Sequence, residues 1–274
     1  MSKVQEVSAS AEDEVLYEVA NHVATITFNA PDRMNTISGP MLNQLTQRLL
    51  DANQDRDVRC VILTGRGRAF CAGLDLRPEK GGVAGLGSGA TSVSTTLDLR
   101  NTPPTVLFEM EKPVIAAING GAAGYGMDTA LGCDIRIMGR SGKLAAAFCK
   151  RGLVPESGGT WFLPRLIGWS KAAELIFTGR TLNAEEAVEW GLATEVVEDA
   201  DLMDRANTLA REIAANAPLA VQAAKRMMRM GLNEPFAEHV HHVYLQLLPL
   251  MRTEDLKEGM ISFMEKRPPV FKGR

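Results

Sequence analysis

The chain has 274 residues, with 30 Lys and Arg against 33 Asp and Glu, which gives a formal net charge of −3. Hydrophobic residues make up 45% and charged residues 23%, a balance that excludes wholesale disorder. This mild acidity argues against a nucleic-acid groove or an anionic membrane surface as partner. No uninterrupted apolar run reaches the ~18 residues of a membrane span. We therefore expect no nucleic-acid partner and no membrane partner.

Cysteine usage and the first residues indicate the compartment. No CxxC pair occurs among the four cysteines, which are Cys60, Cys71, Cys133 and Cys149. Secreted chains usually carry denser, paired cysteines, so these are predicted to be reduced thiols. Residues 1–13 are polar and acidic without the apolar centre of a signal peptide, which predicts a disordered tail. We expect a cytoplasmic protein.

The first hundred residues predict strands, loops and one helix. Residues 23–28 alternate with the period of a strand, after a hairpin turn at Asn21. A helix is predicted from about Pro40 to Asp51, and the apolar run 58–65 predicts a buried parallel strand. The sequence RGRAFCAGLDL that follows turns on glycines. Residues 77–104 are of low complexity, which predicts a lid or a disordered loop.

The second part predicts four more strands, with helices between and after them. A buried strand is expected at 112–119, followed by GGAAGYG, a helix, and short strands in CDIRIMG and KLAAAF. Asn183 with Glu186 has the spacing of a capping box at a helix start, and 194–198 reads as a strand. Four helices then follow, at 201–216, 219–231, 236–251 and 254–266. The pattern indicates an α/β core over 14–200 and a helical region over 201–274.

Two glycine-rich segments each follow a buried strand: AFCAGLDL after VILTG, and GGAAGYGMD after VIAAIN. Glycine lets backbone N–H groups approach a ligand closely, and the second segment opens a helix whose first donors are unpaired. Two such groups on one oxygen would form an oxyanion hole, although closely packed ordinary turns would give the same pattern. There is no phosphate loop and no GxSxG elbow, and GGAAGYG lacks the acidic residue that a dinucleotide site needs.

Histidine and cysteine chemistry receives little support from the sequence. His239, His241 and His242 fall on one predicted helix without the HExxH spacing of a zinc site, so no metal site is expected. Cys71 and Cys149 lie near the glycine-rich and catalytic loops. Buried thiols are usually inert, so neither is expected to act as a nucleophile.

The chain resembles the crotonase superfamily, the enoyl-CoA hydratase/isomerase group, from about residue 15 to 200 and again in the tail GMISFMEKRPPVFKG. The matching stretches include FNAPDRMNTIS, VILTGRGRAFCAGLDL, KPVIAAINGGAAGYGMDTALGCDIRI, GLVPESGGTWFLPRLIG and FTGRTLNAEEAVEWGLATEVV. The resemblance implies a crotonase-like spiral of ββα units with a C-terminal α-helical trimerisation region. It also implies an acyl-CoA thioester as substrate, with coenzyme A as part of that substrate and no other cofactor.

The same resemblance implies positions for the site. The oxyanion hole would be formed by the backbone N–H groups of Leu74 and Tyr125, where many relatives have Gly or Ala in place of the tyrosine. Coenzyme A would lie near Arg33, Met34, Ala72, Asp75 and Leu76. Phe263 and Lys266 match positions that reach the coenzyme A site of a neighbouring subunit, which implies a homotrimer or a homohexamer built as a dimer of trimers.

The resemblance fails at one catalytic position. Hydratases of this family use two glutamates, and the matching positions here are Asp128 and Phe148, of which the phenylalanine moves no proton. Glu156, in GLVPESGGT, lies where related isomerases place an Asp or Glu base. Flanking Phe148, Trp161 and Phe162 are expected to raise its pKa by desolvation.

We therefore favour double-bond isomerisation with Glu156 as the base. Asp128 is expected to be a second acid, a first-turn residue favoured by the helix dipole, or both. The alternatives are a hydratase that uses Asp128, Glu156 or both, a catalytically weak CoA-thioester binder, and another crotonase chemistry such as dehalogenation or C–C cleavage. For the acyl group, residues 77–104 and the Met-rich AKRMMRMG could line the pocket, or the methionines could be ordinary core.

Overall fold

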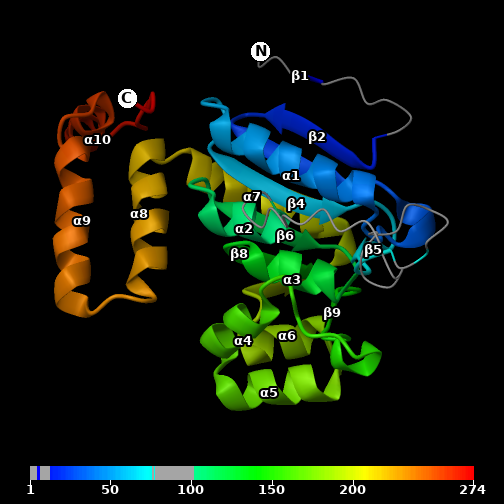
Figure 1. Cartoon of the computed structure of the whole chain (residues 1–274). Coiled ribbons are helices and arrows are strands. Elements are labelled where there is room, and N and C mark those ends of the chain that lie inside the picture. The colour runs from blue at the N-terminus through cyan, green and yellow to red at the C-terminus, as the bar shows by residue number, and fades with distance from the viewer. Residues whose placement is uncertain (1–4, 7–12, 76, 78–101) are drawn as a thin grey trace, which may run out of the picture.

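Two β-sheets form the centre of the molecule in the computed structural model, which describes residues 5–6, 13–75, 77 and 102–274 (Figure 1). Within these residues the larger sheet has seven strands, in the order β1 (Gln5–Glu6), β2 (Val15–Ala20), β3 (Val23–Phe28), β4 (Cys60–Gly65), β6 (Val114–Ile118), β8 (Ile135–Gly139) and β11 (Glu195–Val197). The smaller has four, in the order β10 (Thr181–Asn183), β9 (Lys143–Ala145), β7 (Gly121–Ala123) and β5 (Ala69–Cys71).

A repeated unit of two strands and a helix builds both sheets. β4 joins the larger sheet and β5 the smaller one, ahead of α2 (Pro103–Glu109), and β6, β7 and α3 (Tyr125–Gly132) repeat this order. β8 and β9 lead through a 3-10 turn to α4 (Gly159–Ile167). The predicted spiral of ββα units is thereby confirmed. Because β5, β7 and β9 are parallel neighbours, the loops after them leave one edge of the smaller sheet together.

The larger sheet separates two hydrophobic cores. Along β4, Val61 and Leu63 face the core that contains α1 (Gly39–Gln54), α2 and α3, whereas Cys60 and Ile62 face α7 (Leu202–Ala214). Side chains of a strand alternate between the two faces of its sheet, so a continuous apolar run fits a strand covered on both sides. The buried strand predicted from residues 58–65 is confirmed.

Helices α4, α5 (Trp169–Thr178) and α6 (Ala184–Trp190) lie together at the bottom of Figure 1. The predicted capping box at the start of α6 is present. The Glu186 amide donates to Asn183 Oδ1 over 2.8 Å, and the Asn183 amide donates to Glu186 Oε2 over 2.9 Å. Two main-chain donors at the helix start are thus satisfied by side chains.

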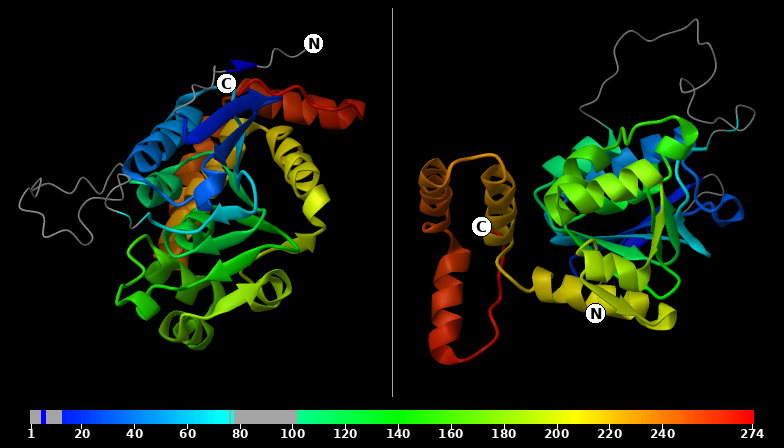
Figure 2. Two further views of the ribbon diagram at one scale, coloured as in Figure 1. Left: turned by 90° about the vertical axis from the view of Figure 1, so that its right-hand side faces the viewer. Right: turned by 90° about the horizontal axis from the view of Figure 1, so that it is seen from below.

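The last helices, α8 (Pro218–Gly231), α9 (Phe236–Leu250) and α10 (Glu254–Glu265), form an arm that stands beside the core (Figure 2). Lys225 Nζ donates to Asp134 Oδ2 and to the Lys112 carbonyl, both over 2.6 Å. Arg229 donates to the Met110 carbonyl over 2.9 Å. These bonds fasten α8 to the core, while α9 and α10 extend away from it.

The structure refines several sequence-based boundaries. Gln5 and Glu6 pair with β2, whereas the sequence predicts no order over 1–13; residues 1–4 and 7–12 lie outside the described residues. Pro103 and Pro104 open α2, whereas the prediction includes them in the segment 77–104, of which 78–101 lie outside the described residues. Proline suits a first helical turn because it needs no N–H donor there.

Predictions for the second half of the chain agree with the structure to different degrees. The strand predicted in KLAAAF is limited to Lys143–Ala145, since the chain turns at Phe148 into the 3-10 turn. Each of the four predicted C-terminal helices is present, with bounds within two residues of those expected. Within the described ranges, no helix is long and apolar enough to cross a bilayer.

Candidate active site

A cavity of about 420 Å³ lies where the loops after β5, β7 and β9 meet the loop between β3 and α1. Many of the residues predicted from the sequence line it together: Arg33, Met34, Ala72, Leu74, Asp75, Tyr125 and Glu156. The lining residues also include the arginines Arg33, Arg68, Arg77 and Arg151. Segments far apart in the chain therefore converge on one site whose wall carries several positive charges.

Asn35 fixes the loop between β3 and α1 against this cavity. Its side chain is fully buried, and its backbone has a φ of 55°, a left-handed conformation that asparagine tolerates better than most residues. Nδ2 donates to the Ala69 carbonyl and Oδ1 accepts from the Ala30 amide, both over 2.8 Å. The side chain joins the loop to β5, which leads into the glycine-rich segment.

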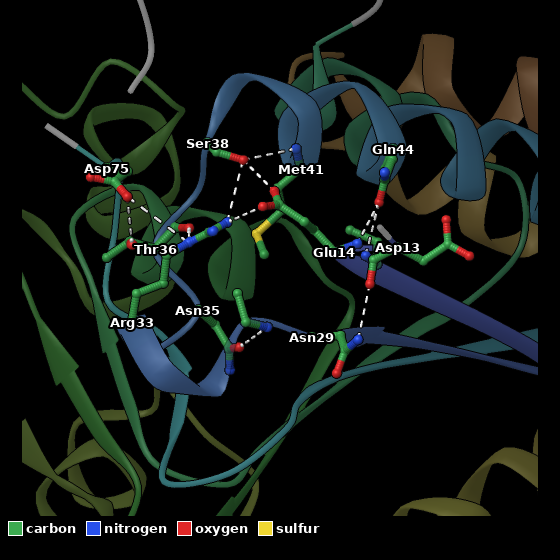
Figure 3. A network of polar contacts seen from close by, with 12 residues as sticks. Asp13, Glu14, Asn29, Arg33, Asn35, Thr36, Ser38, Met41, Gln44 and Asp75 are labelled. Atoms are coloured by element: carbon green, nitrogen blue, oxygen red, sulfur yellow. Dashed lines mark hydrogen bonds and ion pairs between the residues drawn. The ribbon is translucent and has the colours of Figure 1, made fainter. Parts of the chain in front are cut away.

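Arg33 is held at the edge of the cavity by a polar network (Figure 3). Its guanidinium pairs with Glu14 at 2.8 Å and donates to Ser38 Oγ over 3.3 Å and to the Thr36 carbonyl over 3.1 Å. Ser38 also caps α1, because its hydroxyl accepts from the Met41 amide over 3.1 Å. Arg33 is therefore positioned in part by Ser38, the residue that caps α1.

Asp75 is the carboxylate that balances part of this positive charge. It is almost fully buried and pairs with Arg77 at 2.7 Å, while Arg33 lies 3.9 Å away. The hydrogen bonds from Arg77 lower its pKa to about 2, so it stays ionised at neutral pH. Asp75 therefore orients Arg77 and is unsuited to accept a proton from a substrate.

The amides of Leu74 and Tyr125 both belong to the cavity wall. Each follows a glycine with positive φ, Gly73 at 102° and Gly124 at 53°, conformations that other residues rarely adopt. A Cβ built on Gly73 would lie 3.9 Å from the Tyr125 nitrogen, so the two segments approach closely. Among the described residues neither amide donates a hydrogen bond to protein. Two main-chain donors are thus available to a ligand oxygen.

Glu156 lies on the turn that precedes α4 and lines the same cavity. Its side chain is exposed, yet surrounding protein atoms displace enough water to raise its pKa above the ordinary value of a glutamate. The direction is the one predicted from the sequence. The raised pKa makes this carboxylate a better proton acceptor than an ordinary glutamate.

Asp128 does not line this cavity; it is buried in the first turn of α3. Its Oδ2 accepts from Ser157 Oγ over 2.8 Å and from the Gly159 amide over 3.0 Å. Burial raises its pKa to about 7, the nearby Glu156 charge adds to that increase, and these two hydrogen bonds oppose it. Its Oδ1 is buried without a partner among the described residues.

Comparison with known proteins gives the family of this chain. The model of the enoyl-CoA hydratase/isomerase family matches residues 18–274. The chain belongs to the enoyl-CoA hydratase/isomerase family. It is 38% identical over 266 residues to the 1,2-epoxyphenylacetyl-CoA isomerase of Escherichia coli (strain K12), covering 95% of this chain and 98% of that one.

Further relatives of this family differ in the reaction that they are named for. The chain is 37% identical to the (E)-benzylidenesuccinyl-CoA hydratase of Thauera aromatica, over 94% of this chain and 99% of that protein. A crystal structure of enoyl-CoA hydratase from Bacillus anthracis has a TM-score of 0.87 and 35% identity, over 96% of this chain and 100% of the other. This chain is accordingly an acyl-CoA enzyme of the family.

The three aromatic residues predicted to flank Glu156 differ in their contacts. Phe148, at the second hydratase position, lines the cavity, and its ring lies 3.9 Å from a Cβ built on Gly124. Trp161 and Phe162 instead pack on Phe108, with ring centroids 5.2 and 6.3 Å away. Trp161 and Phe162 are not among the residues that line the cavity, and their rings face α2.

Other predicted residues lie elsewhere or outside the description. Leu76 lies outside the described residues. Phe263 and Lys266 are at the end of α10 and do not line the cavity of their own chain. The methionines of AKRMMRMG belong to α8 in the arm, so the prediction that they line this cavity is wrong.

None of the cysteines or histidines is among the residues that line the cavity. All four cysteines are free thiols; Cys149 is exposed, while burial raises the pKa of Cys71 to about 12. His239 and His242 both contact Glu234, at 3.2 and 3.1 Å. In the described ranges no three His, Cys, Asp or Glu side chains are grouped so that they could hold a metal ion.

Several residues of the site were not identified from the sequence. Arg77 and Arg68 carry charge at the cavity, Asn35 fixes its loop, and Ser157 and Gly159 bind the Asp128 carboxylate. The conformational tolerance of asparagine was an available signal for Asn35 in NAPDRMNTIS. For Ser157 no signal existed, since its partner lies 29 residues away in the chain.

Proposed function

We propose that this enzyme isomerises enoyl-CoA thioesters by moving a double bond from the β,γ to the α,β position. The observation that carries the proposal is the placing of Glu156 in one cavity with the free amides of Leu74 and Tyr125. Phe148 stands where the family's second carboxylate would be, and Asp128 is directed into the protein. One proton-transferring group is what an isomerase needs.

The proposed reaction starts with the thioester carbonyl oxygen accepting hydrogen bonds from the Leu74 and Tyr125 amides. The Glu156 carboxylate takes a proton from the α-carbon, and the electron pair of that C–H bond forms a dienolate on the oxygen. Two preorganised amides stabilise this charge, and each such donor typically contributes about 10²–10³ in rate. Protonated Glu156 then returns the proton to the γ-carbon, and a 2-enoyl-CoA leaves. No cofactor besides the coenzyme A of the substrate is required.

The coenzyme A portion is proposed to lie along Arg33, Met34, Ala72, Asp75 and Leu76, with its phosphates near the guanidinium groups. Arg33 is already ordered by Glu14 and Ser38, so little side-chain entropy would be lost when a phosphate binds. Arginine is well suited to phosphate because its planar donors bind two oxygens at once.

Assembly into a homotrimer, or a dimer of trimers, completes the proposal. The arm exposes large apolar side chains, with Phe236 82%, Phe263 85% and Met264 71% exposed. Large apolar side chains that gather on an exposed surface mark interaction sites in many proteins. Light scattering of the full chain is expected to give three or six times its mass of 29.7 kDa. A particle with the mass of one chain would contradict the assembly.

The function is tested by comparing substrates. With purified protein we expect 3-enoyl-CoA to be converted to 2-enoyl-CoA much faster than crotonyl-CoA is hydrated, followed by absorbance and chromatography of the products. Faster hydration of crotonyl-CoA would favour the hydratase alternative, with Asp128 and water. Binding of both thioesters without turnover would favour a CoA-thioester binder.

A further inference from the structure

The Asp128 carboxylate joins two segments that carry different parts of the proposed machinery. Asp128 belongs to the first turn of α3, which begins at Tyr125 and carries that amide. Its partners, Ser157 and Gly159, flank the turn that follows Glu156. A single buried side chain thus connects the helix that bears an oxyanion donor with the turn that bears the base.

Helix α4 begins at this contact. Its N-cap, Gly158, has no side chain to accept the first amides of the helix, and its φ of 114° requires glycine. The Gly159 amide donates instead to Asp128 Oδ2 over 3.0 Å, so α4 is capped by a residue of α3. A carboxylate at a helix N-terminus also interacts favourably with the helix dipole.

The two residues are in close contact. A Cβ built on Gly159 would lie 2.3 Å from Asp128 Oδ1, so any larger residue at 159 would displace the Asp128 carboxylate. Asp128 itself is 1% exposed and is not among the residues that line the cavity. A group that transfers protons to substrate must come within hydrogen-bond distance of it, and the present position of Asp128 is behind the cavity wall.

From this geometry we infer that Asp128 is a positioning residue, which fastens the Glu156 turn to the helix bearing the Tyr125 amide and transfers no proton itself. The inference rests on the proposed function, because it concerns the placing of Glu156 as base. It replaces the expectation that Asp128 is a second acid. The spacing between base and oxyanion donor is thereby set by one side chain rather than by two independent loops.

Substitutions at Asp128 distinguish the two roles. In Asp128→Asn the amide oxygen can accept both hydrogen bonds, so we expect kcat for 3-enoyl-CoA within about 5-fold of the unsubstituted enzyme. In Asp128→Ala both bonds are lost, and misplacement of the base is expected to lower kcat about 10–100-fold with a smaller change in KM. Equal, large losses in the two variants would overturn the inference, because then the ionisable carboxyl itself is required.

A double variant tests whether Asp128 acts through Glu156. In the Glu156→Gln background, Asp128→Ala is expected to cause no further loss of kcat, since the group that it positions is already absent. Losses that multiply would show an independent role and contradict the inference. Glu156→Gln alone tests the proposed function. The experiment therefore distinguishes a wrong function from a wrong role for Asp128.

A milder variant keeps the test valid if Asp128→Ala does not fold. Ser157→Ala removes only one of the two bonds, and a loss of about 3–10-fold in kcat is expected, in line with one hydrogen bond. Thermal unfolding of each variant measures folding independently of activity. A folded Ser157→Ala enzyme with unchanged kcat and KM would count against the fastening role.

Discussion

Glu156→Gln is expected to lower kcat for isomerisation of 3-enoyl-CoA by about 10²–10⁴-fold, the usual contribution of a positioned proton-transfer group. Glutamine has nearly the same volume and polarity, so the cavity wall and the Leu74 and Tyr125 amides should be undisturbed. KM is accordingly expected to change by no more than a few-fold. Initial rates over a range of substrate concentrations separate the two parameters.

Glu189→Gln is a matched control, because Glu189 is an exposed glutamate of α6 that does not line the cavity. We expect its kcat and KM to equal those of the unsubstituted enzyme. A Glu156→Gln enzyme that keeps more than about a tenth of kcat would exclude Glu156 as the principal base. If this variant still hydrates crotonyl-CoA, the enzyme would instead be assigned as a hydratase that uses Asp128 and a water molecule.

The pH dependence of the reaction should also show that Glu156 is the base. Glu156 accepts the α-proton only when ionised, so kcat/KM is expected to rise with pH through the pKa of this group. The surrounding protein atoms place that pKa above the ordinary value of a glutamate, so the rise should occur at higher pH than for a carboxyl that is fully surrounded by water. Asp75 contributes nothing in this range, because its pKa is about 2.

The fold was accessible from the sequence because its signals are local and agree with one another. Residues 23–28 show the alternation of a strand, and residues 58–65 form a continuous apolar run. The second pattern is typical of a strand whose sheet is covered on both faces. The capping box at Asn183 is formed within four residues. The assignment of Leu74 and Tyr125 came from family resemblance, and the structure adds the two positive-φ glycines that precede them.

The parts that the sequence did not disclose depend on contacts between distant segments. In the sequence, an aspartate that faces a ligand cannot be distinguished from one that faces a neighbouring helix. The direction of Asp128 is set by Ser157 and Gly159, which lie about thirty residues further along the chain. The rings of Trp161 and Phe162 are likewise directed by α2, whose presence beside them no local pattern reveals.

Asp128 is also expected to make the stability of the protein depend on pH. Its pKa is about 7 in the folded protein and 3.8 for an ordinary aspartate. Between these values the folded state holds a proton that the unfolded state has released, so the free energy of unfolding contributed by this group decreases as pH rises. This stabilising contribution is fully present below about pH 4 and is lost by about pH 7–8.

Asp128→Asn removes this titration while keeping an uncharged side chain of the same shape. We therefore expect the variant to gain stability relative to the unsubstituted protein as pH rises from 4 to 7, by on the order of 3 kcal/mol. Below pH 4 and above pH 8 the difference should be constant. Denaturant unfolding followed by tryptophan fluorescence, at one protein concentration and several pH values, measures it. A difference that is independent of pH, or that changes in the opposite direction, would show that Asp128 is ionised in the folded protein throughout this range.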